Sequence, residues 1–192
     1  MWVCLTEDYG RCGKVSGIMR VVLFDLDDTL FDQQYCSRAG LLAVQKAYAG
    51  RIGGSIEEIE SAYSALLEQW HEKVLAGLIS IDESRVERFR VLLSTTQNVA
   101  TNEESEAAAG CYRDAYDAAY RPVPGAIEIL QRVKAACPIG IVTNHIRSEQ
   151  VKKIVAIGVE PFIDELVVSD EVGVAKPAAQ VFQTALSRLG GT

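Results

Sequence analysis

Short apolar runs alternate with amphipathic segments along much of this chain. The runs occupy residues 21–24, 139–143 and 166–168, and each is bounded by proline or polar residues. Runs of this kind are typical of strands that are buried on both faces of a parallel sheet. Because helical periodicity follows the second and third runs, the pattern predicts an α/β fold, a doubly wound parallel sheet (a Rossmann-like core) with helices on both faces.

Residues 33–121 contain no convincing strand pattern and instead carry apolar positions three and four residues apart, as in amphipathic helices. Ser55 and Thr101 each precede a glutamate by three residues, which is the capping-box pattern of a helix start. Asp82 is a candidate N-cap for a helix between them. We therefore expect an inserted α-helical cap subdomain over residues 33–121.

The segments on either side of this insert, residues 19–32 and 122–192, are expected to form the α/β core. Pro177 is expected at the first position of the last helix, a place that proline favours. Residues 1–18 lack the continuous apolar stretch of a secretory signal, and a second methionine, Met19, lies just before the first apolar run. We therefore expect residues 1–18 to be a disordered leader or to result from a misassigned start.

The charge and the cysteine content narrow the class of protein. The 192 residues include 19 basic and 26 acidic side chains, a net charge of −7, which argues against a nucleic-acid-binding surface. No apolar run approaches the roughly 20 residues of a membrane span. The five cysteines form no C-x-x-C pair, so neither a zinc site nor a disulfide framework is predicted. We expect a cytoplasmic protein that binds neither nucleic acid nor membranes.

The run Asp25-Leu26-Asp27-Asp28-Thr29, directly after the first apolar segment, is the strongest chemical signal in the chain. Side chains alternate along a strand, so Asp25 and Asp27 are expected to start on one face and to reach one spot. Two such carboxylates can supply a nucleophile or metal ligand and also a proton donor. Taken alone, a D-x-D sequence also suits a strand-end turn with local backbone bonds.

Two later motifs favour the catalytic interpretation. Thr143-Asn144 ends the second apolar run, and Lys176-Pro177 follows the third. The ordered segments FDLDDTLFD, IGIVTN and VVSDEVGVAKP resemble the haloacid dehalogenase-like hydrolase superfamily, and the resemblance covers residues 19–190. The phrases PVPGAIEIL and SDEVGVAKP are most similar to its α-helical-cap phosphatases related to pyrimidine 5′-nucleotidases.

The resemblance implies a role for each motif residue. Asp25 attacks phosphorus and forms an aspartyl-phosphate, and Asp27 protonates the leaving alcohol and then activates water. Thr143 donates a hydrogen bond to a phosphoryl oxygen, Asn144 either binds the phosphate or caps, and Lys176 neutralises phosphate charge. Mg²⁺ is bound by the Asp25 carboxylate, the Asp27 backbone carbonyl and a later acidic residue. The residue types agree with these implied roles. A site made only of oxygen ligands suits Mg²⁺, and phosphoryl transfer depends on positioning and charge stabilisation.

The leading prediction is a Mg²⁺-dependent phosphomonoester hydrolase for a small phosphorylated metabolite, with a nucleoside monophosphate as one candidate. A 2-haloacid dehalogenase shares the fold and the nucleophile, but it expels halide and needs no proton donor, so Asp27 favours the phosphatase. A phosphomutase of the same fold stays open as an alternative. So does a non-catalytic remnant that holds a phosphorylated ligand without turnover.

One motif of the superfamily has no counterpart in the sequence. The superfamily carries one or two acidic residues at the end of a further strand, a few tens of residues after its lysine. Sixteen residues follow Lys176, and they predict a single helix. The nearest acids, Asp170 and Glu171, belong to the third motif itself. We therefore expect a C-terminally incomplete core that lacks one metal ligand, and weak or absent phosphatase activity of the 192-residue chain.

Overall fold

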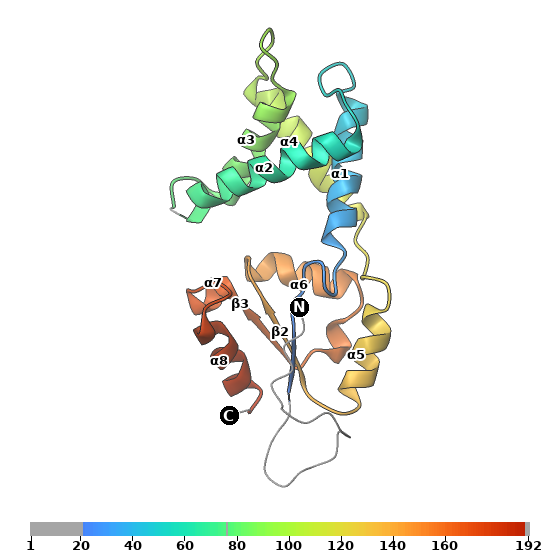
Figure 1. Ribbon diagram of the computed structural model, residues 1–192, viewed down its shortest axis with the longest axis vertical. Helices are drawn as coiled ribbons and strands as arrows, with labels where there is room; N and C mark the ends of the chain where they lie inside the picture. Colours follow the sequence, from blue (N-terminus) through green and yellow to red (C-terminus); the bar gives the residue numbers. More distant parts are fainter. Residues whose placement is uncertain (1–20, 76, 191–192) are drawn as a thin grey trace. The chain divides into compact units, whose positions relative to one another are not determined.

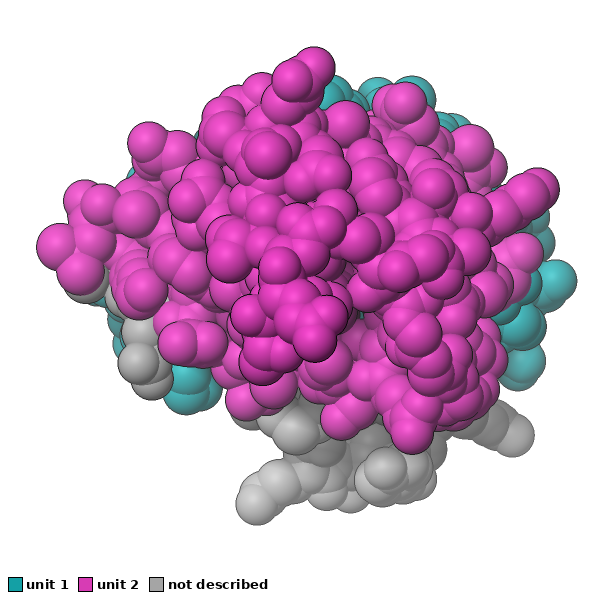
Figure 2. Space-filling view, turned by 90° about the horizontal axis from the view of Figure 1, so that it is seen from above, with its two compact units in different colours: residues 1–33, 120–192 teal, residues 34–119 magenta. Residues whose placement is uncertain are grey.

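The computed structural model describes residues 21–75 and 77–190, so the predicted leader, residues 1–18, lies outside the described residues. The chain divides into two compact units, which Figure 2 distinguishes by colour. Unit 1 comprises residues 1–33 and 120–192, and unit 2 comprises residues 34–119.

Unit 1 contains a parallel sheet in the order β1-β2-β3, formed by β1 (Val22–Phe24), β2 (Ile139–Thr143) and β3 (Glu165–Val168). Phe24 pairs with Ile141, and Ile141 pairs with Leu166, so the carboxyl ends of the strands meet at one edge. The other elements of unit 1 are α5 (Ala126–Lys134), α6 (Arg147–Ala156), the 3₁₀ helix η1 (Glu160–Phe162), α7 (Ser169–Val172) and α8 (Ala179–Arg188).

Helices cover both faces of this sheet, with α8 on one side and α5 on the other (Figure 1). On the α8 side, valines of β2 and β3 pack with Val181 and Ala185 into a buried cluster. Gly140 permits this close packing, because a Cβ atom there would lie 2.7 Å from a methyl carbon of Leu23. The predicted α/β fold, a parallel sheet with helices on both faces, is confirmed.

The last helix begins later than the sequence predicted. Helix α8 starts at Ala179 with Ala178 as its N-cap, so the placement of Pro177 at the first helical position is wrong. The residues before the helix form a turn in which the N–H of Ala178 donates to the carbonyl of Ala175 at 3.0 Å. This turn carries Lys176 toward the carboxyl ends of the strands.

Unit 2 is helical, as predicted, and consists of α1 (Gln33–Ala47, whose first residue belongs to unit 1), α2 (Ile56–Leu75), α3 (Ile81–Leu93) and α4 (Asn102–Ala118). The capping boxes at Ser55 and Thr101 are both formed. The predicted N-cap of α3 is wrong, since Ser80 caps this helix. Asp82 lies in the first turn, where its carboxylate binds Arg85 at 2.6 Å.

Aromatic side chains form the centre of unit 2. The rings of Tyr63, Phe89 and Tyr112 lie 5.2–5.5 Å apart, and Tyr116 stacks on Tyr112 at 5.7 Å. The buried guanidinium of Arg88 lies 5.1 Å from the centre of the Tyr63 ring. The insert therefore has a core of its own. Over the part of the chain that the structure describes, no helix combines the length and the apolar character needed to cross a membrane.

Candidate active site

The segment after β1 folds into a turn instead of continuing as a strand. The carbonyl of Leu26 accepts hydrogen bonds from the N–H groups of Leu30 and Phe31, both at 2.9 Å, and all three side chains are buried. Asp28 lies in this turn with φ 55°, a left-handed conformation that aspartate tolerates. A buried and hydrogen-bonded turn therefore carries the two aspartates that the sequence singled out.

These two aspartates have different partners. Oδ1 of Asp25 lies 2.5 Å from Nζ of Lys176 and accepts the N–H of Leu26 at 2.7 Å. Asp27 is bound instead by two side chains of α6. Since β1 ends at Phe24, the alternation that predicted a shared strand face does not extend to the turn. The turn directs each carboxylate to its own cation.

Asn144 ties the backbone of Lys176 to the end of β2. Its Oδ1 accepts the N–H of Lys176 at 2.7 Å, and its Nδ2 donates to the carbonyl of Lys176 at 3.3 Å. Both polar atoms of the Asn144 amide are used in this way. These bonds hold a turn and do not cap a helix, since Ile146 is the N-cap of α6 and Ala178 is that of α8. Contact of Asn144 with phosphate stays a prediction.

Thr143 is buried at the end of β2, with 1% of its surface exposed. Its Oγ1 accepts a hydrogen bond from Nε2 of Gln150 at 2.8 Å and donates to the carbonyl of Asn144 at 3.3 Å. The hydroxyl is thus hydrogen-bonded within unit 1, and its predicted bond to a phosphoryl oxygen stays a prediction.

Two residues of α6 hold the carboxylate of Asp27. Nζ of Lys153 lies 2.6 Å from Oδ1, and Nε2 of Gln150 lies 3.0 Å from Oδ2. Lys153 and Gln150 are both buried, which is unusual for residues of these types. Each oxygen of the Asp27 carboxylate therefore has one donor from the same helix.

Gln150 and Lys153 were not among the residues predicted from the sequence. A signal was available, because residues 150, 153, 154 and 157 follow the helical spacing of three and four that marks an inward face. Ile154 and Ile157 fit that face as apolar residues and are buried. Polar residues at two inward positions of an otherwise amphipathic helix indicate partners in the core.

The acidic residues of the third motif bind the start of α6. Oδ2 of Asp170 accepts the N–H of Arg147 at 3.0 Å, and Oε2 of Glu171 lies 2.7 Å from the Arg147 guanidinium. Ser169 accepts the N–H of His145 at 3.1 Å. These contacts join the segment after β2 to α7 at the edge of the sheet where Asp25 also lies.

A metal site in this region would rest on few protein ligands. Among the residues that the structure describes, no three histidine, cysteine, aspartate or glutamate side chains form a group that could hold a metal ion. The carboxylate of Asp25 and the backbone carbonyl of Asp27 offer the oxygen donors that Mg²⁺ prefers. This small set fits Mg²⁺, which is usually held by one or two carboxylates and substrate phosphate while it keeps several waters.

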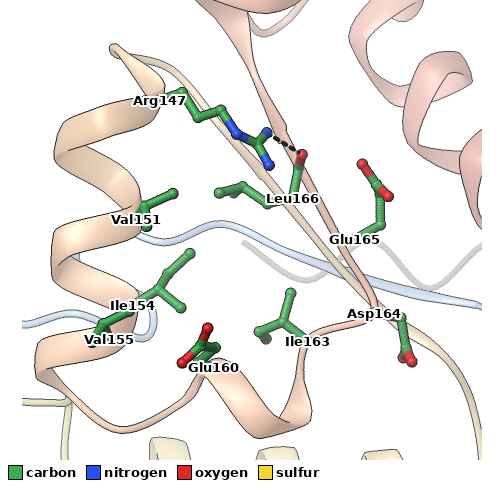
Figure 3. Close-up of a pocket in the computed structure, with 9 residues that line it drawn as sticks. All are labelled: Arg147, Val151, Ile154, Val155, Glu160, Ile163, Asp164, Glu165 and Leu166. Atoms are coloured by element: carbon green, nitrogen blue, oxygen red, sulfur yellow. Dashed lines mark hydrogen bonds between the residues drawn. The ribbon is translucent and has the colours of Figure 1, made fainter.

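A separate groove of about 340 Å³ lies between α6 and β3 (Figure 3). Val151 and Val155 line it from the helix and Leu166 lines it from the strand, where Arg147 donates to the Leu166 carbonyl at 3.1 Å. None of the five predicted site residues lines this groove. The candidate active site is therefore the cluster at the strand ends, not this groove.

Comparison with known proteins finds relatives that are named as a phosphatase and a nucleotidase. The chain is 29% identical to a glyceraldehyde 3-phosphate phosphatase of Methanothermobacter thermautotrophicus over 175 residues, which cover 90% of this chain and 73% of that protein. It is 28% identical to the pyrimidine 5′-nucleotidase YjjG of Escherichia coli, over 88% of this chain and 71% of the relative.

A solved structure with the same fold is the magnesium-bound HAD-hydrolase YfnB of Bacillus subtilis. It superposes with a TM-score of 0.66 at 23% identity, over 89% of this chain and 72% of that one. The family model of haloacid dehalogenase-like hydrolases matches residues 19–192, a span that contains Asp25, Asp27, Thr143 and Lys176. This chain therefore belongs to the haloacid dehalogenase-like hydrolases.

Proposed function

We propose that this chain is a Mg²⁺-dependent phosphomonoester hydrolase that acts on a small phosphorylated metabolite through an aspartyl-phosphate on Asp25. The observation that carries the proposal is the ion pair of Asp25 with Lys176, while the second carboxylate, Asp27, is held separately by α6. A carboxylate nucleophile beside a fixed cation, with an independent group for proton transfer, meets the needs of two-step phosphoryl transfer.

The two steps use the aspartates in turn. First, a carboxylate oxygen of Asp25 bonds to phosphorus as the bond between phosphorus and the ester oxygen breaks. Asp27, which enters this step as the carboxylic acid, gives the departing oxygen its proton. A water molecule then attacks the phosphorus and passes a proton to Asp27, and the bond between phosphorus and Asp25 breaks. Inorganic phosphate leaves, and both aspartates return to their starting states.

Lys176 supplies the fixed positive charge. Its side chain is one-fifth exposed, so solvent screens its field less than at an open surface. A preorganised donor in such a site contributes roughly 3–4 kcal/mol to the transition state, judging from the loss of an oxyanion donor. When bound, Mg²⁺ would add charge stabilisation at the phosphoryl oxygens from a position beside Asp25 and the carbonyl of Asp27.

The names of two relatives support the proposed substrate class. One is a glyceraldehyde 3-phosphate phosphatase and another is a pyrimidine 5′-nucleotidase, and both names describe small phosphate esters. A dehalogenase of the same fold is the second candidate, but its chemistry leaves the proton-transfer role of Asp27 without a use. A phosphomutase would return the phosphoryl group to a sugar, so product analysis distinguishes it from a hydrolase.

The test is phosphate release by the 192-residue chain from a panel of esters: glyceraldehyde 3-phosphate, uridine 5′-monophosphate, glycerol 3-phosphate and 4-nitrophenyl phosphate. Each is assayed with 5 mM Mg²⁺ and with excess EDTA, and 2-chloropropionate is included to detect halide release. Because one acidic metal ligand of the superfamily has no counterpart in this sequence, we expect weak release that EDTA abolishes, that Mg²⁺ restores and that Asp25→Asn lowers to the background rate.

The matched control is Asp82→Asn, because this aspartate side chain is 90% exposed and lies in unit 2. Its activity should equal that of the wild-type chain. Phosphate release that survives Asp25→Asn would contradict the assignment of the nucleophile. Folded protein that releases no phosphate from any ester would contradict the proposed hydrolase and favour a ligand-binding chain.

A further inference from the structure

We infer that Gln150 and Lys153 of α6 are positioning residues that hold the carboxyl group of Asp27 for proton transfer and tie it to Thr143. This inference rests on the proposed function, because it assigns a task to groups that surround the proposed acid and base. Neither residue belongs to the three motifs that the sequence analysis singled out.

The geometry fixes both oxygens of the Asp27 carboxylate. Nζ of Lys153 lies 2.6 Å from Oδ1, and Nε2 of Gln150 lies 3.0 Å from Oδ2. A single donor would leave the carboxylate free to rotate about its bond to Cβ. Two donors on two oxygens, delivered by neighbouring turns of one helix, determine the plane of the carboxylate as well as its direction.

The Gln150 amide also reaches the second motif. The same Nε2 atom lies 2.8 Å from Oγ1 of Thr143 and 3.2 Å from the carbonyl of Asn144. One buried amide nitrogen thus contacts the turn after β1 and the end of β2 together. A shift of α6 would therefore alter the hydrogen bonding of both Asp27 and Thr143.

Because Gln150 and Lys153 are buried, their contacts with Asp27 differ from polar contacts at the protein surface. The side chain of Lys153 is 5% exposed, and its ammonium lies 4.9 Å from the centre of the Phe31 ring. Oε1 of Gln150 is buried and has no hydrogen-bond partner among the described residues. Burying a charge and leaving an acceptor unsatisfied both cost stability, so the arrangement favours a role beyond packing.

The next lysine on the same helix provides a contrast. Lys152 is 61% exposed and lies 3.4 Å from Glu149, one helical turn away. An exposed pair of this kind contributes little to stability. Lys152→Met is therefore the matched control for Lys153→Met, since it removes the same functional group from the adjacent position of α6.

The test compares two leaving groups. A departing alkoxide needs a proton, whereas 4-nitrophenolate is stable as an anion and needs little help from an acid. For wild-type chain, Gln150→Ala, Lys153→Met and Lys152→Met, kcat/KM is measured on 4-nitrophenyl phosphate. It is also measured on whichever of uridine 5′-monophosphate, glycerol 3-phosphate and glyceraldehyde 3-phosphate is hydrolysed fastest. The constant kcat/KM reports the first step, in which the leaving group departs.

Gln150→Ala and Lys153→Met should each lower kcat/KM for the alkyl ester by about 10–100-fold, since a misplaced catalytic group commonly costs this much. For 4-nitrophenyl phosphate the loss should stay below about threefold. Lys153→Arg keeps the charge and should recover most of the alkyl-ester rate, and Lys152→Met should match wild type. Equal losses on both esters, or no loss on either, would overturn the inference, because a merely structural role affects both esters alike.

A melting experiment tests the contact without relying on activity. Lys153→Met is made in the wild-type chain and in Asp27→Asn. We expect it to lower Tm by about 5 °C in the wild-type chain and by less than half as much in Asp27→Asn, where the buried lysine has already lost its carboxylate. The same fall in both backgrounds would overturn the inference. If the wild-type chain hydrolyses no ester, the proposed function fails, and this cycle alone decides whether Lys153 holds Asp27.

Discussion

Nζ of Lys176 lies 2.5 Å from Oδ1 of Asp25, although these residues come from opposite ends of the folded core in sequence. The contact depends on the parallel sheet, which brings the carboxyl ends of its strands to one edge. It also depends on Asn144, whose side chain holds the backbone of Lys176 at that edge. Predictions about activity follow from this arrangement, and predictions about stability follow from the packing around it.

Loss of the Lys176 charge should reduce phosphate release. Lys176→Met is expected to lower kcat by about 10²–10³-fold, because the transition state loses its fixed cation. Lys176→Arg should be intermediate, since the charge is kept but the planar guanidinium has a different reach. The measurement is kcat on the fastest alkyl ester, with Lys152→Met as the exposed control. An unchanged kcat in Lys176→Met would show that this lysine has no part in the reaction.

The kinetics of an Asn144 variant should distinguish the two possible roles of this residue. If it positions Lys176, as the hydrogen bonds indicate, Asn144→Ala should lower kcat by about tenfold with little change in KM. If it binds the phosphate of the substrate directly, KM should rise instead. Steady-state kinetics on one ester decides between them, and Asn98→Ala, an exposed asparagine of unit 2, provides the control. A rise in KM alone would contradict our expectation.

Replacing each of two helical glycines of unit 2 by alanine should change the stability of the chain in opposite directions. A Cβ atom at Gly40 would lie 2.9 Å from the backbone oxygen of Tyr112 and closer still to its ring, whereas at Gly110 nothing lies within 4 Å. Gly40→Ala should destabilise the chain by about 1–3 kcal/mol through overpacking. Gly110→Ala should stabilise it by about 0.5–1 kcal/mol. Urea unfolding measures both changes, and effects of the same sign would contradict the packing described for α1 and α4.

The stability of unit 1 should depend on Asp164 in a pH-dependent way. Its carboxylate binds Lys134 at 2.5 Å and accepts the N–H of Ile139 at 2.7 Å, which joins α5 to the start of β2. The hydrogen bond from Lys134, followed by that from Ile139, lowers the pKa of Asp164 below its usual 3.8. Since the folded pKa is the lower one, the stabilisation is present above about pH 4 and is lost as pH falls through the folded pKa.

Asp164→Asn should therefore lower Tm by about 2–4 °C at pH 7, a small effect because the pair is about one-third exposed. Near pH 2.5 the variant and the wild-type chain should melt much closer together. Melting curves at the two pH values measure this difference, with Asp114→Asn, an exposed aspartate of α4, as the control. A Tm difference that is the same at both pH values would contradict the assigned pKa direction.

Much of the fold could be predicted from local pattern. The three apolar runs correspond to β1, β2 and β3 to within a residue, because a strand buried on both faces needs apolar side chains at successive positions. The capping boxes at Ser55 and Thr101 also formed as predicted, since both partners lie within four residues of each other. The N-cap assigned to Asp82 and the first helical position assigned to Pro177 were wrong, because Ser80 and Ala178 nearby serve as the N-caps of these helices.

The candidate site was only partly predictable. Asp25 and Thr143 lie at strand ends and Lys176 lies in a motif, so all three could be identified from the sequence. The partners of Asp27, Gln150 and Lys153, belong to no motif. They are ordinary helix residues, and their role depends on which face of α6 is turned inward. The turn after β1 was considered only as an alternative for the D-x-D sequence, and it replaced the shared strand face that was expected for the two aspartates.

The sequence by itself determined which elements form, the order in which they occur and the residue types that could perform phosphoryl chemistry. Hydrophobic spacing, capping partners and short motifs each involve residues close together in the chain, so they can be recognised from the sequence alone. Only the tertiary structure decided that Lys176 binds Asp25 and that α6 holds Asp27. Those contacts join residues more than a hundred positions apart, and they form because parallel pairing and helix packing bring the strand ends and α6 to the same edge of the sheet.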